Sequence, residues 1–176
     1  ETRSVKDELK RDKILQYEST REQTRVLFIT NDTDFSHPSY YRRQQFEELA
    51  SVFDEIHIVV LGSVAAAPIK TQRLQPNVWL YGTGSQGFLW RLYDGYQRAV
   101  SELVFNDEFR ADVIVALEPY EAAALAAYLS ATYGRPWQLH LRTTLTDTLA
   151  LGQYQWWRTL FMRYALKRAE SVRTVS

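Results

Sequence analysis

RVLFITND, residues 25–32, is the stretch that decides the fold. Four apolar residues in succession follow Arg25, and no polar residue alternates with them. Such a run is typical of a strand that is buried on both faces, as strands of parallel sheets are. The run breaks off into Asn31 and Asp32, and a helical pattern follows. This order predicts an open α/β sheet that presents a polar loop at the carboxyl end of its first strand.

Strands and helices alternate along the rest of the chain. Further strands are predicted over residues 55–62, 77–82, 111–119, 135–141 and 171–176, and helices over 40–53, 88–105, 120–134 and 156–169. Apolar strands separated by helices predict a parallel sheet that is covered on both faces. The right-handed crossover rule then gives an α/β, Rossmann-like three-layer α/β/α sandwich with a mostly parallel sheet.

Apolar stripes predict which side of each helix faces the core. In the second predicted helix the stripe consists of Leu89, Leu92, Tyr93, Tyr96, Val100 and Leu103. In the first it consists of Tyr41, Gln45, Leu49 and Val52, widened by Phe46 and Phe53.

The last predicted helix combines aromatic and basic residues. Its aromatic and apolar members include Trp156, Trp157, Leu160, Phe161 and Tyr164, and its basic members are Arg158, Arg163, Lys167 and Arg168. Basic amphipathic helices can lie on membranes. The spacing of Trp157, Leu160, Phe161 and Tyr164 is also that of a core-facing stripe, so we expect core packing rather than membrane contact.

Composition and missing motifs exclude several classes of function. The chain has no cysteine, which excludes disulfides, thiolate metal sites and cysteine nucleophiles. Lysine plus arginine equals aspartate plus glutamate at 21 each, so we expect no nucleic-acid partner. No histidines have the spacing of metal ligands, and neither a dinucleotide fingerprint nor a P-loop is present. With no signal peptide and no run of membrane-spanning length, a cytoplasmic protein is predicted.

The chain divides into a charged head and one domain. Residues 1–24 carry charges of both signs around a few apolar positions, which predicts a solvated helix or a linker. Residues 25–176 are predicted to form the Rossmann-like domain. Because the sequence begins at Glu1 rather than methionine and stops directly after a strand, we expect a piece of a longer protein.

Ligands of open α/β sheets bind beyond the carboxyl ends of the strands, where the strand order reverses. In the usual order the first and fourth strands are neighbours there, so the loops that follow them should meet. The predicted cleft residues are Asn31, Asp32, His37, Tyr40, Tyr41, Arg42, Glu118, Tyr120, Glu121, Arg142 and Thr143. These polar groups suit a polyhydroxyl ligand such as a sugar or a nucleotide-sugar.

Two kinds of candidate also have a structural interpretation. Glu118 either accepts hydrogen bonds from ligand hydroxyls or caps the helix that starts near Tyr120. His57 and His140 fall inside predicted strands, where hydrogen-bonded structural histidines are expected.

Three stretches carry a resemblance to a known family. They are YRRQQFEELASVFDEIHIVVLG, residues 41–62, ADVIVALEPYEAAALAAYLSATYGRPWQLHLR, residues 111–142, and ALKRAESVRTVS, residues 165–176. Together with the opening strand they resemble the N-terminal, acceptor-side domain of retaining nucleotide-sugar glycosyltransferases of the family 4 type. Those enzymes have the GT-B architecture of two Rossmann-like domains.

The resemblance implies a binding site for a sugar or glycan acceptor. His37, Tyr40, Tyr41 and Arg42 would contact the acceptor, and Glu118, Tyr120, Glu121 and Arg142 would line the cleft floor. The nucleotide-sugar donor would be a substrate held mainly by a C-terminal domain of the same protein, and no further cofactor and no metal is expected. The full-length protein would be a hexosyltransferase, and residues 1–176 alone would be inactive. No catalytic residue is assigned.

Departures from the family pattern keep two other hypotheses open. The glycine pair frequent after the first strand is replaced by SHPSYY, residues 36–41, and the frequent histidines of two motifs fall at Glu118 and Arg142. One alternative is a non-catalytic, flavodoxin-like module that binds a ligand or partner. The other is half of a sugar-nucleotide epimerase of similar fold, in which Glu118 and His37 would matter more.

Overall fold

The structure is a computed structural model that describes residues 24–32, 40–62, 71–84, 87–105, 108–141 and 156–174. The strands are β1 (Arg25–Thr30), β2 (Glu55–Val60), β3 (Gln72–Gln75), β4 (Val78–Gly82), β5 (Val104–Phe105), β6 (Glu108–Phe109), β7 (Val113–Ala116), β8 (Trp137–Leu141) and β9 (Ser171–Thr174). The helices are α2 (Tyr40–Val52), α3 (Phe88–Leu103), α4 (Glu121–Tyr133) and α6 (Trp156–Arg168). Except for Thr24, the predicted charged head lies outside the described residues.

The sheet has seven strands in the order β3-β4-β2-β1-β7-β8-β9. All neighbouring pairs are parallel except β3 with β4, which is antiparallel. The six predicted strands follow the doubly wound order, with the first strand between the second and the fourth. The predicted fold class is therefore confirmed.

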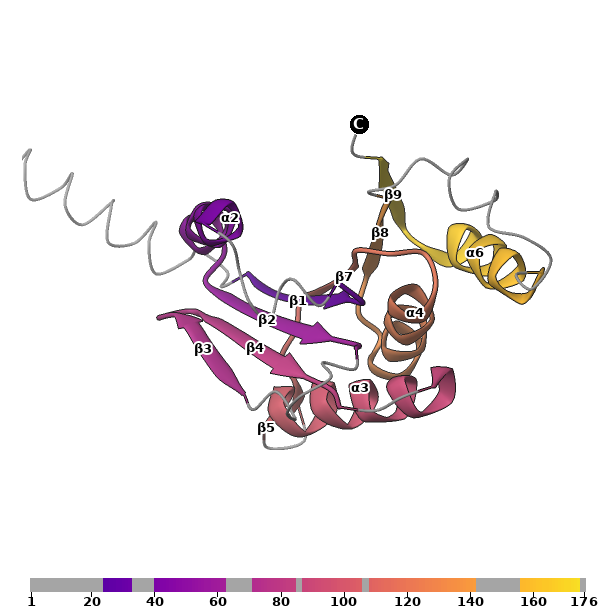
Figure 1. Ribbon diagram of the computed structural model, residues 1–176, viewed down its shortest axis with the longest axis horizontal. Coiled ribbons are helices and arrows are strands. Elements are labelled where there is room, and N and C mark those ends of the chain that lie inside the picture. The colour runs from indigo at the N-terminus through magenta and orange to yellow at the C-terminus, as the bar shows by residue number, and fades with distance from the viewer. Residues whose placement is uncertain are drawn as a thin grey trace, which may run out of the picture.

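Helices cover both faces of this sheet (Figure 1). On one face α3, α4 and α6 lie over a core that includes Leu27 and Ile29 of β1. On the other face α2 packs through Leu49, Ala50 and Phe53 on alternate residues of the same strands. Successive side chains of a strand point to opposite faces of the sheet, so residues of the two cores alternate along each strand.

Three short strands were missed by the sequence prediction: β3, β5 and β6. Strand β3 has the sequence QRLQ and adds an edge to the sheet through a turn at Pro76 and Asn77. The pair β5–β6 is a two-residue hairpin that takes the last two residues of the helix predicted over 88–105. Neither segment has a long apolar or alternating pattern from which a strand could be predicted.

The apolar stripe predicted for α3 is wrong at two of its positions. Leu89 and Tyr93 are exposed, at 75% and 55%, and Gly95, Ala99 and Leu103 are the buried residues. A Cβ added at Gly95 would overlap Cδ2 of Leu61 and lie 2.8 Å from Cδ2 of Leu125. Because small residues let α3 lie close to its neighbours, the helix is rotated away from its bulkiest stripe.

The predicted stripes of α2 and α6 also need correction. Val52 of α2 is exposed at 59%, although Leu49 and Phe53 pack as predicted. In α6 Leu160 and Tyr164 are exposed, at 53% and 46%, and Met162 and Ala165 are buried instead. Core packing was thus the wrong expectation for Leu160 and Tyr164.

Candidate functional site

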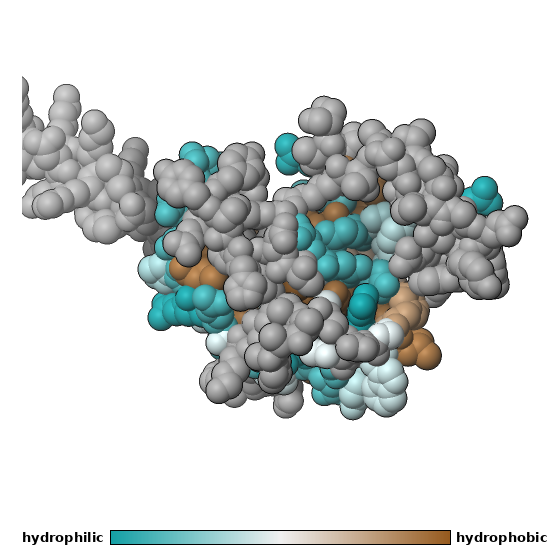
Figure 2. Space-filling model, viewed as in Figure 1, coloured by the Kyte–Doolittle hydropathy of each residue, from teal (hydrophilic) through white to brown (hydrophobic). Residues whose placement is uncertain are grey.

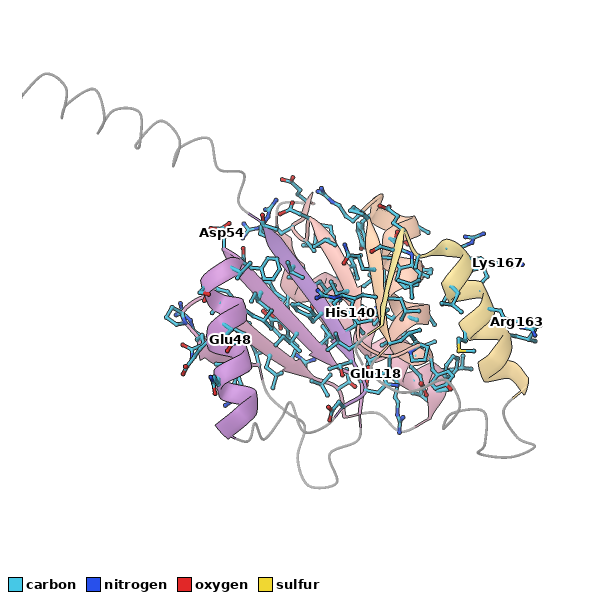
Figure 3. The ribbon with its side chains drawn as sticks, turned by 90° about the horizontal axis from the view of Figure 1, so that it is seen from above. Glu48, Asp54, Glu118, His140, Arg163 and Lys167 are labelled. Atoms are coloured by element: carbon cyan, nitrogen blue, oxygen red, sulfur yellow. The ribbon has the colours of Figure 1, made fainter. Side chains whose placement is uncertain are left out.

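The carboxyl ends of β1 and β7 lie side by side at the centre of the sheet. The two strands pair in parallel, with Ile29 opposite Ala116, so the residues after them leave the sheet at the same edge. The chain passes from β1 to β2 on one side and from β7 to β8 on the other. This is the switch point at which the doubly wound fold opens a crevice. Figure 3 shows Glu118 at this edge, where the strand ends converge.

The carboxylate of Glu118 connects the two strand ends. Its Oε1 accepts a hydrogen bond from the Thr30 hydroxyl at 2.8 Å, and its Oε2 accepts one from the Asn31 backbone N–H at 2.9 Å. Both oxygens are thus held by fixed donors. The N-cap residue of α4 is Tyr120, and it makes no side-chain cap bond.

The Thr30 hydroxyl extends this network by one bond. Thr30 is fully buried, and its Oγ1 also accepts a hydrogen bond from the Asp32 backbone N–H at 3.0 Å. The hydroxyl therefore fixes both the loop and the carboxylate. Sequence reasoning missed Thr30 because a β-branched residue that ends an apolar run is assigned to the strand.

Glu121 is a second carboxylate at the same edge. It is the first residue of α4, it is only 4% exposed, and its Oε2 accepts a hydrogen bond from the Asn31 side-chain Nδ2 at 2.8 Å. An acid in the first turn of a helix is favoured by the helix dipole. Asn31 thus contacts one carboxylate through its backbone and the other through its side chain.

The Asn31 side-chain oxygen is the unsatisfied group of this cluster. Oδ1 is buried, yet it has no hydrogen-bond partner among the described residues, while Nδ2 of the same amide is bonded to Glu121. A buried amide oxygen without a donor is costly, so such an atom is suited to accept a hydrogen bond from a ligand.

The remaining predicted cleft residues divide into two groups. Asp32 and Tyr120 are half-buried at the same edge as Glu118. His37, Arg142 and Thr143 lie outside the described residues, and for Tyr40, Tyr41 and Arg42 only the backbone, at the start of α2, is described. The structure therefore brings together Asn31, Asp32, Glu118, Tyr120 and Glu121.

His57 has the hydrogen-bonded, structural surroundings expected of a histidine inside a strand. His57 is buried, its Nδ1 lies 2.7 Å from the Tyr81 hydroxyl and its Nε2 lies 2.7 Å from Oε1 of Glu55. The ring also stacks on Trp79 at 5.1 Å. Burial lowers the pKa of His57 although Glu55 opposes the shift, and burial raises the pKa of Tyr81. His140 is the next residue of β8 after Leu139, which pairs with Ala116, so it lies close to the carboxyl edge at which Glu118 is found.

Metal binding and membrane spanning have no support within the described ranges. No group of three or more histidine, aspartate or glutamate side chains is arranged there to hold a metal ion. None of the helices described in the structure has the length and apolar character that crossing a bilayer requires.

Comparison with models of protein families gives a match over most of the chain. The model of the glycosyl transferase 4-like domain family matches residues 38–176. The comparison with curated proteins gave no match.

Proposed function

The chain belongs to the glycosyl transferase 4-like domain family, and we propose that it is the acceptor-binding domain of a retaining glycosyltransferase. The acceptor is a sugar or glycan. Its hydroxyl groups bind at the switch-point edge formed by Asn31, Glu118, Tyr120 and Glu121. The family match favours this hypothesis over a non-catalytic module.

The observation that carries the proposal is the pair of carboxylates joined through Asn31. Sugars are neutral and rich in hydroxyl donors, so fixed acceptors arranged in a crevice are what their recognition requires. Glu118 and Glu121 offer carboxylate oxygens that Thr30 and Asn31 hold in place, and Oδ1 of Asn31 offers a further acceptor. Each acceptor is immobilised in the absence of ligand, which reduces the entropy lost on binding.

The same acceptors are unsuited to the phosphates of the donor. Two carboxylates at one edge repel a diphosphate. We therefore assign the nucleotide-sugar donor mainly to a C-terminal Rossmann-like domain, as in a GT-B architecture. His37, Tyr40, Tyr41, Arg42, Arg142 and Thr143 complete the acceptor side of the cleft in this proposal. No metal and no further cofactor takes part.

Two measurements test the proposal. The first is saturation-transfer NMR of residues 1–176 with a panel of methyl glycosides and, separately, nucleotide-sugars. We expect a glycoside to bind and Glu118→Gln to weaken it about tenfold, since a hydrogen bond to a charged group contributes about 1.5–3 kcal/mol. Glu48→Gln, at an exposed acid of α2, is the matched control and should leave binding unchanged.

The second measurement is transfer of a labelled sugar from the nucleotide-sugar panel to the glycoside that binds. We expect no transfer by residues 1–176 alone, and transfer by the natural polypeptide when it includes a second α/β domain. Binding of nucleotide-sugars but no glycoside would contradict the acceptor role. Transfer by residues 1–176 alone would contradict the proposal that a second domain is needed to bind the donor.

A further inference from the structure

We propose that the outer surface of α4 and α6 binds an anionic lipid bilayer. The surface consists of the exposed residues Tyr128, Leu160, Arg163, Tyr164, Lys167 and Arg168, and it is called the α4–α6 surface below. It lies on the flank of the sheet, and it is distinct from the carboxylate cluster at the switch point.

The side of helix α6 that faces the core is not the side predicted from its aromatic residues. Met162 and Ala165 face the core, so the positions on the other side of the helix face solvent. Leu160, Arg163, Tyr164, Lys167 and Arg168 fall on that side, at the spacings of three, four, seven and eight residues that share a helix face. Figure 3 shows Arg163 and Lys167 pointing away from the sheet.

An apolar groove lies between α6 and its neighbour. It has a volume of about 500 Å³ and is lined by Ala124, Ala127, Tyr128, Ala131, Leu160 and Tyr164. The row of alanines on α4 makes its floor, and the two tyrosines and the leucine project beside it. A groove of this size that is lined by apolar side chains and open to solvent is expected to be covered in the working protein.

The apolar surface continues onto α3. Tyr96 meets Tyr128 edge to face, with ring centroids 5.4 Å apart, and Leu89 and Tyr93 precede Tyr96 at spacings that place them on the same side of α3. Trp90 is 66% exposed and contacts Tyr93. Hydrophobic surface beside α3 and α4 is visible in Figure 2. A bilayer can contact such a broad strip more readily than a compact ligand can.

The positive charge of the α4–α6 surface indicates which kind of partner binds it. Helix α6 contains no aspartate or glutamate, and the one acid of α4, Glu121, is buried at the far end of the helix. The first acid after α6 is Glu170. The surface therefore combines exposed cations with tyrosines, and the guanidinium of Arg168 lies 4.7 Å from the Tyr164 ring centre. Exposed aromatic rings beside lysine and arginine are typical of helices that lie at the interface of anionic membranes.

A second copy of the chain fits this surface less well. In a two-fold symmetric dimer each patch meets itself, so Arg163, Lys167 and Arg168 would approach the same three cations of the other copy. With no exposed acid on α4 or α6 to pair with them, such an interface would be repulsive.

The test is co-sedimentation of the chain with vesicles of phosphatidylcholine, alone or with about 30% phosphatidylglycerol. We expect binding to the anionic vesicles only, falling as salt is raised from about 50 to about 500 mM. Each cation near an anionic surface strengthens binding about fivefold, so Arg163→Gln/Lys167→Gln should weaken it about 25-fold. Leu160→Ser/Tyr164→Ser should weaken it as well, through lost apolar contact.

The matched control is Arg73→Gln/Arg173→Gln. It removes the same number of charges from exposed positions on β3 and β9 rather than on α6, and should leave vesicle binding unchanged. Circular dichroism of every variant establishes that it is folded. The proposal is overturned by the absence of binding to anionic vesicles at low salt, or by equal losses in both charge variants. Self-association that Leu160→Ser/Tyr164→Ser abolishes, without vesicle binding, would assign the surface to a second copy instead.

Discussion

Glu118 at the end of β7 accepts a hydrogen bond from the backbone N–H of Asn31, which follows β1 and lies 87 residues earlier in the chain. The bond holds two loops together at the one place in a doubly wound sheet where neighbouring strands lead away in opposite directions. Because the loops are fixed before any ligand arrives, their acceptor atoms are already oriented for binding. The strand order thus brings the two loops together, and the residues of the loops provide the hydrogen-bonding groups.

The Thr30 hydroxyl should contribute more to the free energy of unfolding than an ordinary surface hydroxyl does. Thr30→Val removes the donor to Glu118 and the acceptor for the Asp32 N–H, so we expect a loss of about 1–3 kcal/mol in the free energy of unfolding. Thr132→Val removes an exposed hydroxyl that bonds the Tyr128 carbonyl and should change stability by less than about 0.5 kcal/mol. Urea denaturation measures both. Equal losses would show that the Thr30 network is not specially stabilising.

Gly95 should resist replacement by alanine. An alanine normally stabilises a helix interior by about 1 kcal/mol relative to glycine, but here its Cβ would overlap Leu61 and crowd Leu125. Overpacking costs about 1–3 kcal/mol, so we expect Gly95→Ala to be net destabilising in thermal denaturation. Ser101→Ala, at an exposed position of the same helix, should be neutral or slightly stabilising. A stabilising Gly95→Ala would mean that α3 is less closely packed.

His57 should make stability depend on pH below neutrality. Burial lowers its pKa in the folded state, so as pH falls below about 6.5 the unfolded chain takes up the proton first. The contribution of neutral His57 is therefore complete above about pH 6.5 and is lost as pH falls through its folded-state pKa. We expect the free energy of unfolding to fall more between pH 7.5 and pH 5 in the wild type than in His57→Gln. Parallel curves for the two proteins would refute this.

The Arg25–Asp112 pair should stabilise the start of the central strands. Burial works to raise the pKa of Asp112, but hydrogen bonds from Arg25 outweigh it and hold that pKa below its usual value. This contribution is present above about pH 4 and is lost as pH falls through the lowered pKa. A double-mutant cycle with Arg25→Met and Asp112→Asn should give a coupling of up to about 1 kcal/mol, given that both groups are partly exposed.

The pair Arg98–Glu102 is the control for that cycle. Its atoms are 3.8 Å apart on the exposed side of α3, so its coupling should be at most about 0.5 kcal/mol. A coupling at Arg25–Asp112 no larger than this one would contradict the role assigned to it.

The strand order was predictable because each central strand is an unbroken apolar run, such as VLFI in β1 and IVV in β2. Strand β3 was not, since its four residues pair at an edge and two of them are exposed. The orientation of α3 and α6 was also not predictable. The orientation depends on small residues, Gly95 and Ala165, that pack against neighbours distant in sequence. An apolar stripe in the sequence indicates only where the large apolar side chains lie.

The sequence predicted where the residues of the candidate site lie, but not which hydrogen bonds they form. Polar residues after the first and fourth strands had to meet once the strand order was known, and Asn31, Glu118 and Glu121 do. The partner of each carboxylate oxygen depends on side-chain rotamers, which a sequence pattern does not contain. Thr30 escaped prediction because a β-branched residue at the end of an apolar run is assigned to the strand.

The acceptor site is tested most directly by following the backbone amides of an isotope-labelled chain as a methyl glycoside is added. We expect the largest chemical-shift changes at the amides of Asn31, Asp32, Leu117, Glu118, Tyr120 and Glu121, with small changes along α6. The same changes should be absent in Glu118→Gln at equal glycoside concentration. Changes confined to other parts of the sheet, or none with any glycoside in the panel, would contradict the assignment of this edge to the acceptor.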